Sequence, residues 1–398
     1  MDITIIPKKL SGTVMAIPSK SQAHRLLICS AFAEKDTILD CPETNQDIEA
    51  TADCLNALGA EITRTNSGYT IRPVRTLPQE AVLNCRESGS TLRFLLPVVG
   101  ALGVDATFEM SGRLPDRPLS PLWEVMEENG CTLTRHTKNT LHCAGKLKPG
   151  NYMISGNVSS QYITGLLFAT ALIPQACQLS ITGKLESAPY VTMTQKALEI
   201  YGVDSNNYRI NADSAFHSPG KISVEGDWSN GAFFLGAQAI GNSVNTENLD
   251  ENSPQGDKAI VSCLAQLNHN CTISCEDFPD LVPILAVVAG CKQGATLSGI
   301  GRLRLKESDR VESVAAMLRA FGAAVDIDKD AFTVYPAPFT SCTIDAMSDH
   351  RIAMAAAIGA TVASGPVTII GAECISKSYP AFWDVYKQLG GQYEQYIR

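Results

Sequence analysis

The chain has 398 residues and is acidic, with 32 basic against 41 acidic side chains and a formal net charge of −9. This length suits two domains better than one core, and the negative charge argues against a general nucleic-acid-binding surface. The 13 cysteines form no CxxC pair and no Cys/His cluster, so neither a metal site nor a disulfide framework is supported. We see no secretory signal and no apolar run long enough for a membrane span, so we expect a cytoplasmic protein.

A polar opening followed by about ten apolar residues is the first recurring pattern. Residues 17–33, IPSKSQAHRLLICSAFA, predict a strand end, a turn and a buried helix capped by Ser19 or Ser21. The same construction recurs five more times, starting at Glu87, Ser159, Gly226, Pro279 and Ser348. The spacing is regular, with 69 positions from Ser19 to Ser88 and 71 from Ser88 to Ser159. Such a period indicates internal repetition.

Amphipathic helices form the second recurring pattern, and all of them except Gln255–Leu267 end before a glycine, which is typical of a helix C-cap. We expect them at Ile48–Leu58, Leu119–Asn129, Val191–Ile200, Gln255–Leu267, Arg310–Phe321 and Ala381–Leu389. Strands are predicted between the two kinds of helix. The fold class is therefore α/β, with two inside-out domains of three βαβαββ-like repeats each and with buried helices.

The domain boundaries follow from where the repeats begin and end. The third repeat ends near residue 225, and Met1–Ile6 predicts a strand that precedes the first helical unit. We therefore expect a first domain at 14–225 and a second domain made of 1–13 plus 226–398. The chain would cross between the domains twice, which predicts a two-stranded hinge.

Cations gather at the turns and helix openings, where free N–H groups and the helix dipole already favour anions. They are Lys20, Arg25, Arg93, Arg117, Arg302, Arg304, Lys306, Arg310, Arg351 and Lys377. If the repeats converge, an acidic protein holds a basic cleft for a small, highly anionic substrate. No P-loop, no GxGxxG after a strand, no GxSxG elbow and no metal motif is present. The chemistry must then run on Lys, Arg, Glu and Asp.

Three stretches carry the strongest chemical signals. In LRLKESDRV, Glu307 sits among cations, where a carboxylate can exchange a proton with a substrate. In SDHR, Arg351 opens an apolar helix and needs an anionic partner. In FPDLVP, Asp280 is either an N-cap or a general base, and the sequence alone favours the cap.

These motifs resemble the 5-enolpyruvylshikimate-3-phosphate synthase family. PSKSQAHR, SGSTLR, RLPDRP, SSQ, KESDR, DHR and the lysine of SKS occur in the family's order over essentially the whole chain. The resemblance implies transfer of the enolpyruvyl group of phosphoenolpyruvate to the 5-hydroxyl of shikimate 3-phosphate, with release of phosphate. It also implies two inside-out domains that close on the substrates, with no metal and no organic cofactor.

The resemblance carries the family's residue roles onto matching positions. Asp280 and Glu307 would be the acid/base pair, with Lys20 assisting. Shikimate 3-phosphate would be held by Lys20, Ser21, Arg25, Ser159, Ser160, Gln161, Ser187, Tyr190, Asp280 and Lys306. Phosphoenolpyruvate would be held by Lys20, Gly89, Arg117, Gln161, Arg310, Arg351 and Lys377.

Some positions depart from the family's commonest pattern, namely Glu87–Ser88, Ser90, Phe94 and Arg302–Leu303. Gly89 is retained, so we expect a glyphosate-sensitive pocket. Three alternatives stay open: a UDP-N-acetylglucosamine enolpyruvyl transferase, an RNA 3′-phosphate cyclase, and a non-catalytic phosphoshikimate-binding relative. The first alternative usually has a reactive cysteine in the loop that reads RLPDRP here, so this loop and KESDR disfavour it. The net charge disfavours the second alternative. We expect a monomer whose partners are small molecules, without nucleic acid or membrane.

Overall fold

The computed structural model describes residues 1–396 and divides the chain into two compact units. Unit 1 combines residues 1–17 with those from Glu225 onward, and unit 2 is Pro18–Val224. Each unit has a hydrophobic core of its own. The chain passes between the units twice, at residues 17–18 and 224–225.

The unit boundaries differ by a few residues from the expected domains. Strand β2, Ser11–Met15, contains the expected boundary after residue 13. Its Val14 and Met15 pair with Thr246 and Glu247, which belong to unit 1. Residues 14–17 therefore belong to unit 1 and not to the first domain, because strand pairing holds them there.

Unit 2 holds three repeats, each built around one buried helix. Its helices are α1 Lys20–Ala31, α2 Gln46–Ala57, α3 Gly89–Leu102, α4 Leu122–Glu128, α5 Ser160–Leu172 and α6 Ala188–Ile200, with 3₁₀ turns η1 Leu114–Asp116 and η2 Asn206–Tyr208. Its strands are β3 Thr37–Asp40, β4 Glu61–Thr65, β5 Gly68–Arg72, β6 Glu80–Asn84, β7 Asp105–Glu109, β8 Cys131–Thr137, β9 Thr140–Gly145, β10 Asn151–Ser155, β11 Cys177–Thr182, β12 Arg209–Ile210 and β13 Lys221–Ser223. They form sheets in the orders β13-β3-β5-β4, β6-β7-β9-β8 and β10-β11-β12.

Unit 1 repeats the same plan. Its helices are α7 Trp228–Ala239, α8 Ile260–Gln266, α9 Val282–Cys291, α10 Arg310–Phe321, α11 His350–Ala360 and α12 Phe382–Gln388, with 3₁₀ turns η3 Gly256–Ala259, η4 Pro279–Leu281, η5 Gly301–Leu305 and η6 Ala372–Lys377. Its strands, besides β2, are β1 Asp2–Ile6, β14 Ser243–Glu247, β15 Cys271–Ser274, β16 Ala295–Ser298, β17 Val325–Ile327, β18 Ala331–Val334, β19 Cys342–Asp345, β20 Val367–Ile370 and β21 Gln392–Tyr396. Their sheets have the orders β14-β2, β15-β16-β18-β17 and β19-β20-β1-β21.

One pairing rule recurs in the sheets. The strands before and after a buried helix pair in parallel, as β6 and β7 do around α3, and antiparallel strands complete the sheet. In the repeats around α1 and α7 the parallel partner is distant in sequence: β3 pairs with β13, and β14 pairs with β2. In the last repeat, β1 is the antiparallel strand between β20 and β21. Parallel strands that follow one another in sequence need a crossover connection, and the buried helix between them supplies it.

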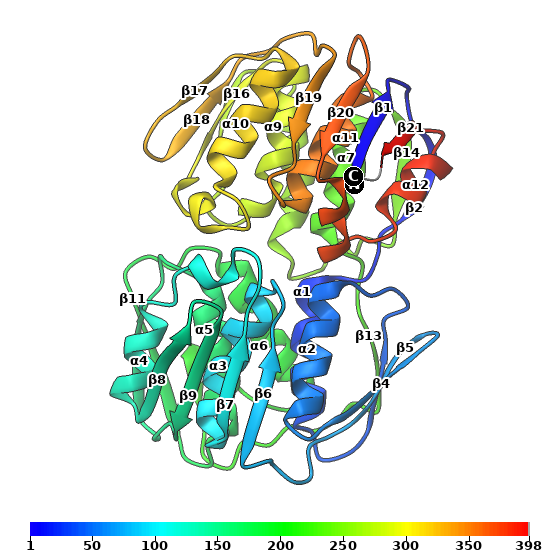
Figure 1. Cartoon of the computed structure of the whole chain (residues 1–398). Coiled ribbons are helices and arrows are strands. Elements are labelled where there is room, and N and C mark those ends of the chain that lie inside the picture. The colour runs from blue at the N-terminus through cyan, green and yellow to red at the C-terminus, as the bar shows by residue number, and fades with distance from the viewer. Residues whose placement is uncertain (397–398) are drawn as a thin grey trace. The chain divides into compact units, whose positions relative to one another are not determined.

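The buried helices lie inside and the sheets cover them, as expected. Figure 1 shows β6, β7, β9 and β8 as one layer over α3 and α5, and α3 packs against α5, β7 and β9. A Cβ atom on Gly165 of α5 would lie 2.2 Å from the carbonyl oxygen of Arg93 in α3, so glycine is required for this close approach. The predicted C-cap glycines have positive φ, for example 101° at Gly59 and 99° at Gly322.

Two features are absent from residues 1–396. None of their helices is long and apolar enough to cross a membrane. No group of His, Cys, Asp and Glu side chains among these residues is arranged to hold a metal ion.

Candidate functional site

In unit 2, the buried helices begin where the predicted substrate residues lie. Ser19, and not Ser21, is the N-cap of α1, because its hydroxyl accepts a hydrogen bond from the Gln22 amide. Lys20 therefore opens the helix. Its Nζ lies 2.9 Å from Oδ2 of Asp47 in α2, and both side chains are largely buried. Asp47 was given no role from the sequence, because its partner lies 27 positions away.

Arg25 is one of the most enclosed cations of unit 2, with 2% of its surface exposed. Its Nε donates to Oγ1 of Thr194 at 2.9 Å, and its Nη2 donates to the Tyr190 carbonyl at 2.8 Å. Burial lowers the pKa of Arg25 to about 10, which still leaves the guanidinium charged at neutral pH. The guanidinium also lies 5.2 Å from the ring centre of Phe94. Arg25 and Tyr190, predicted to share one substrate, are thus brought together.

The start of α5 holds Gln161 between two residues of α3. Oε1 of Gln161 accepts from Nη1 of Arg93 at 3.0 Å, and its Nε2 donates to Oγ of Ser90 at 3.0 Å. Ser159 caps α5 through the Gln161 amide, and the adjacent Ser160 is buried. Arg93 and Ser90 were not among the predicted site residues. Their position in SGSTLR was the available signal, but nothing in that stretch pointed to Gln161.

Gly89 opens α3 directly beside two guanidinium groups. A Cβ atom there would lie 2.6 Å from Nη1 of Arg93 and 2.7 Å from Nη1 of Arg117. Any side chain at this position would therefore displace an arginine. The absence of a side chain at Gly89 therefore leaves room for both guanidinium groups beside its backbone.

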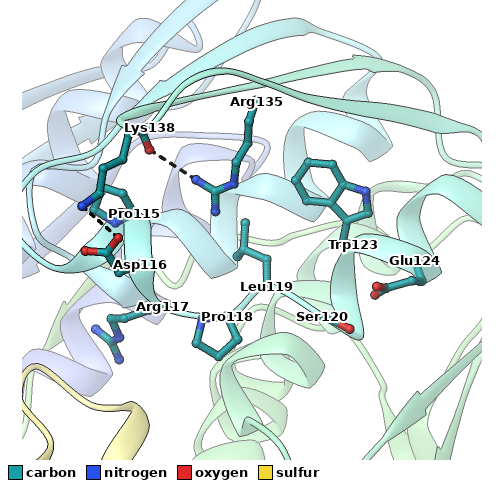
Figure 2. A pocket seen from close by; sticks show the side chains of 10 residues that line it. All are labelled: Pro115, Asp116, Arg117, Pro118, Leu119, Ser120, Trp123, Glu124, Arg135 and Lys138. Atoms are coloured by element: carbon teal, nitrogen blue, oxygen red, sulfur yellow. Dashed lines mark hydrogen bonds and ion pairs between the residues drawn. The ribbon is translucent and has the colours of Figure 1, made fainter.

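Arg117 also borders a pocket of about 510 Å³. Leu119, Trp123, Arg135 and Lys138 line other parts of it, and Lys138 pairs with Asp116 at 3.0 Å. Figure 2 shows the Arg117 side chain pointing away from Arg135 and Trp123. Residues 115–118 of the RLPDRP loop therefore line this pocket, and the Arg117 guanidinium also lies close to Gly89. Ser187, the remaining predicted residue of unit 2, precedes α6 with a φ of 54° and is buried.

In unit 1, the predicted residues form a charge cluster centred on Arg310; its carboxylates are Asp280, Glu307 and Asp349. Arg310 is completely buried. Its Nη1 donates to Asp280 at 2.8 Å, its Nη2 to Glu307 at 2.6 Å and its Nε to Asp349 at 2.9 Å. Burial alone would lower the pKa of Arg310, but Asp349, Glu307 and Asp280 raise it above its ordinary value.

Asp280 joins three cations. Besides Arg310, its carboxylate lies 2.9 Å from Nη2 of Arg351 and 3.6 Å from Nζ of Lys306. Burial alone would raise the pKa of Asp280, but Arg351, Lys306 and Arg310 together hold it well below its usual value. The favoured cap interpretation was wrong: α9 begins at Val282 with Leu281 at its N-cap position. Asp280 faces the cations instead, and it is the anionic partner expected for Arg351.

The opening of α11 completes the cluster. Asp349 is its N-cap and accepts a hydrogen bond from the Arg351 amide at 3.0 Å, while its other oxygen accepts from Ser308 at 3.0 Å. Burial lowers the pKa of Lys306, and the nearby Asp280 carboxylate offsets only part of this effect. Lys377 is the last residue of η6, and its Nζ donates to the carbonyl of Ser348, next to Asp349, at 2.9 Å. Asp349 was not predicted, because SDHR alone reads as an ordinary cap.

Similarity to known proteins extends over nearly the full length of the chain. The sequence model of EPSP synthase (3-phosphoshikimate 1-carboxyvinyltransferase) matches residues 5–278 and 269–386. The chain belongs to the EPSP synthase family. It is 36% identical to the 3-phosphoshikimate 1-carboxyvinyltransferase of Clostridium kluyveri, covering 99% of this chain and 98% of the relative. The enzyme of Clostridium acetobutylicum is 34% identical with the same coverage.

The fold is shared with solved members of the family. An EPSP synthase from Acinetobacter baumannii superposes with a TM-score of 0.80 at 22% identity, covering 99% of this chain and 100% of that one. The inside-out α/β fold class is thereby confirmed. Family membership also favours the shikimate 3-phosphate enzyme over the related sugar-nucleotide transferase.

Proposed function

We propose that this chain transfers the enolpyruvyl group of phosphoenolpyruvate to the 5-hydroxyl of shikimate 3-phosphate and releases phosphate, as a transferase of the shikimate pathway. The observation that carries the proposal is the full-length family match, together with the charge cluster of unit 1. Both substrates are small and anionic, and several fixed cations are needed to offset their mutual repulsion.

Shikimate 3-phosphate is assigned mainly to unit 2. Hydroxyls of Ser159 and Ser160 at the opening of α5 suit its phosphate, because N–H groups and the helix dipole point there as well. Arg25 is fixed by Thr194 and Tyr190, so it offers charge at little entropic cost. Ser21, Gln161 and Ser187 add polar contacts. From unit 1, Lys306 and Asp280 would reach the same substrate.

Phosphoenolpyruvate is assigned to cations of both units. Lys20, Arg117 and the Gly89 backbone come from unit 2, with Gln161 contacting both substrates. Arg310, Arg351 and Lys377 come from unit 1. Because the two sets lie in different units, catalysis needs both units, and we propose that they close on the substrates about the double crossing. Closure would exclude water from the reaction.

Asp280 and Glu307 would share the proton transfers. In the ligand-free protein, Arg310 and Arg351 are paired with Asp280, and its low pKa makes it a poor base. Phosphoenolpyruvate would take over these cations, so the pKa of Asp280 would rise toward its ordinary value. Asp280 then accepts the proton of the 5-hydroxyl as its oxygen attacks C2.

Glu307 would protonate the methylene carbon of phosphoenolpyruvate, which makes C2 cationic and open to that attack. The product is a tetrahedral adduct carrying both phosphate and the new C–O bond. Glu307, now a carboxylate, takes a proton back from the methyl group as phosphate departs, and the double bond is restored. Lys20 would assist by balancing charge on the departing phosphate. The proposal includes no metal and no organic cofactor, and it describes a cytoplasmic monomer.

Phosphate release from phosphoenolpyruvate, with and without shikimate 3-phosphate, tests the proposal. We expect release only with shikimate 3-phosphate, a decrease in kcat of about 10²–10⁴ for Glu307→Gln, and a large loss for Lys20→Ala. Glu312→Gln is the matched control, because Glu312 lies in α10 but pairs with the partly exposed Arg304. Glyphosate should inhibit the reaction, since Gly89 is retained.

Three results would contradict parts of this proposal. Release with UDP-N-acetylglucosamine alone would assign the chain to the sister activity. Absence of release with either acceptor, in a folded sample that binds shikimate 3-phosphate, would indicate a binding protein. Activity unaffected by millimolar glyphosate would refute the sensitive pocket.

A further inference from the structure

A chain of hydrogen bonds connects the first three helices of unit 2. Nδ1 of His24 in α1 lies 2.7 Å from Oγ1 of Thr51 in α2, and that hydroxyl lies 2.7 Å from Oγ1 of Thr91 in α3. Thr91 donates in turn to Oγ of Ser88, at 2.7 Å. All four side chains are completely buried. We refer to His24, Thr51, Thr91 and Ser88 as the hydroxyl chain.

The protons of the hydroxyl chain run in one direction. A hydroxyl has a single proton, and Thr91 donates it to Ser88 at 2.7 Å or to the Asp47 carbonyl at 3.4 Å, so Thr91 accepts from Thr51. Thr51 must then accept from His24. Burial, aided by Lys20 and Arg25, holds the pKa of His24 well below its ordinary value, so the ring is neutral. Its donor role toward Thr51 then assigns the ring proton to Nδ1. Every contact in the chain therefore has one donor and one acceptor.

The hydroxyl chain lies one helical turn below the residues that face the anions. His24 follows Lys20 by four positions in α1, and Thr51 follows Asp47 by four positions in α2. Asp47 is the ion-pair partner of Lys20, and its carbonyl lies 3.4 Å from the Thr91 hydroxyl. Ser88 caps α3 and directly precedes Gly89. The chain thus ties together the helix starts that present Lys20 and Gly89.

We propose that His24, Thr51 and Thr91 are positioning residues that fix the distance between the Lys20 ammonium and the Gly89 amide, and thereby the binding of phosphoenolpyruvate. This inference rests on the proposed function, which assigns both groups to that substrate. Apolar packing alone lets helices slide by fractions of an ångström, whereas a buried hydrogen bond has one narrow optimum of distance and angle. Misplacement of a binding group by about 1 Å can cost two orders of magnitude in rate.

Thr51→Val and Thr91→Val test the inference, because each keeps the side-chain shape and removes one hydroxyl. Thr170→Val is the matched control: Thr170 is also completely buried in unit 2, but its hydroxyl donates only within α5, to the Leu166 and Leu167 carbonyls. Steady-state phosphate release gives KM for each substrate and kcat, and urea unfolding gives stability. Thr51→Ser keeps the hydroxyl and serves as the rescue.

We expect Thr51→Val and Thr91→Val each to raise KM for phosphoenolpyruvate about tenfold. KM for shikimate 3-phosphate should change less than threefold, because Lys20 is only one of its assigned contacts and Arg25 is held by α6. The double variant should be no worse than either single variant, since one break opens the chain. Thr51→Ser should stay within about twofold of the parent, and Thr170→Val should lose stability without a change in KM.

Other outcomes separate the inference from the proposed function. If the parent protein releases phosphate but both valine variants keep its KM within twofold, the inference is wrong and the function stands. An equal rise in KM for phosphoenolpyruvate in Thr170→Val would show that the hydroxyl chain contributes only general packing, and would also overturn the inference. If the parent releases no phosphate, the proposed function fails first. Should Thr51→Val not fold, Thr91→Val and Thr51→Ala decide by the same criteria.

Discussion

Buried charge in unit 1 is fully paired before any substrate arrives. Arg310 reaches three carboxylates, and Asp280 reaches three cations. Removing one member of such a cluster leaves its partner desolvated, which costs far more than the pair contributes at a surface. The same arrangement lets an anionic ligand replace a carboxylate without stranding a cation. This exchange is why we place the substrate anions there.

His24 supplies a prediction of pH dependence at the scale of one residue. Its folded-state pKa is depressed by burial, so below about pH 6.5 the unfolded chain binds a proton that the folded chain does not. Stability is therefore fully present above that pH and falls as the pH decreases, by up to about 1.4 kcal/mol per pH unit. Urea unfolding between about pH 7.5 and 5.5 should show this slope, and His24→Gln should remove that part of it. Identical slopes in both proteins would contradict a neutral His24.

At the scale of the element, a helix N-cap can serve the helix alone or the site as well. Asp309 caps α10 and pairs with the partly exposed Arg304, whereas Asp349 caps α11 and holds the buried Arg310. Both residues look alike in sequence, each one position before its arginine or histidine opening. Only the three-dimensional partner separates them.

The two caps form a matched pair for mutation. Asp349→Asn should destabilise the protein by about 3 kcal/mol, because a buried ion pair is broken, and should lower kcat/KM. Asp309→Asn should cost less than about 1 kcal/mol, since asparagine also caps and the lost pair is exposed. Urea unfolding and the phosphate assay measure both. Equal losses in the two variants would show that Asp349 acts only as a cap.

For the whole molecule, the two hydrophobic cores are separate although the chain crosses between units twice. Unit 1 depends on both ends of the sequence, because β1 lies between β20 and β21 in the middle of a sheet. Unit 2 instead is continuous in sequence. A substitution in the core of one unit should therefore destabilise mainly that unit.

Ile3 in β1 and Ile71 in β5 are both completely buried in inner strands, one in each unit. Ile3→Ala and Ile71→Ala should each cost about 2–5 kcal/mol through the lost methylenes and the cavity left behind. Hydrogen exchange followed by mass spectrometry should show faster exchange in β19–β21 for the first variant and in β3–β5 for the second. Faster exchange throughout both units in either variant would contradict independent cores.

Sequence patterns alone were enough to predict the repeats, the buried helices, their capped openings and the concentration of cations there. They were enough because these features are local: apolar runs, capping side chains and glycines act within a few positions. The resemblance to the family rested on the same short motifs.

The pairing of the charged side chains, in contrast, is visible only in the folded structure. Asp280 pairs with Arg310, 30 positions away in the sequence, and with Arg351, 71 positions away. Arg93 and Gln161, which form a hydrogen bond, are 68 positions apart. No local pattern encodes such a pairing, so Asp280 looked like a cap, and Arg93 and Asp349 were left without roles. The boundary after residue 17 was missed for the same reason, since β2 belongs to unit 1 through its pairing with β14. Folding brings these groups together because the stacked repeats align their helix openings, and burial then requires every charge to have a partner.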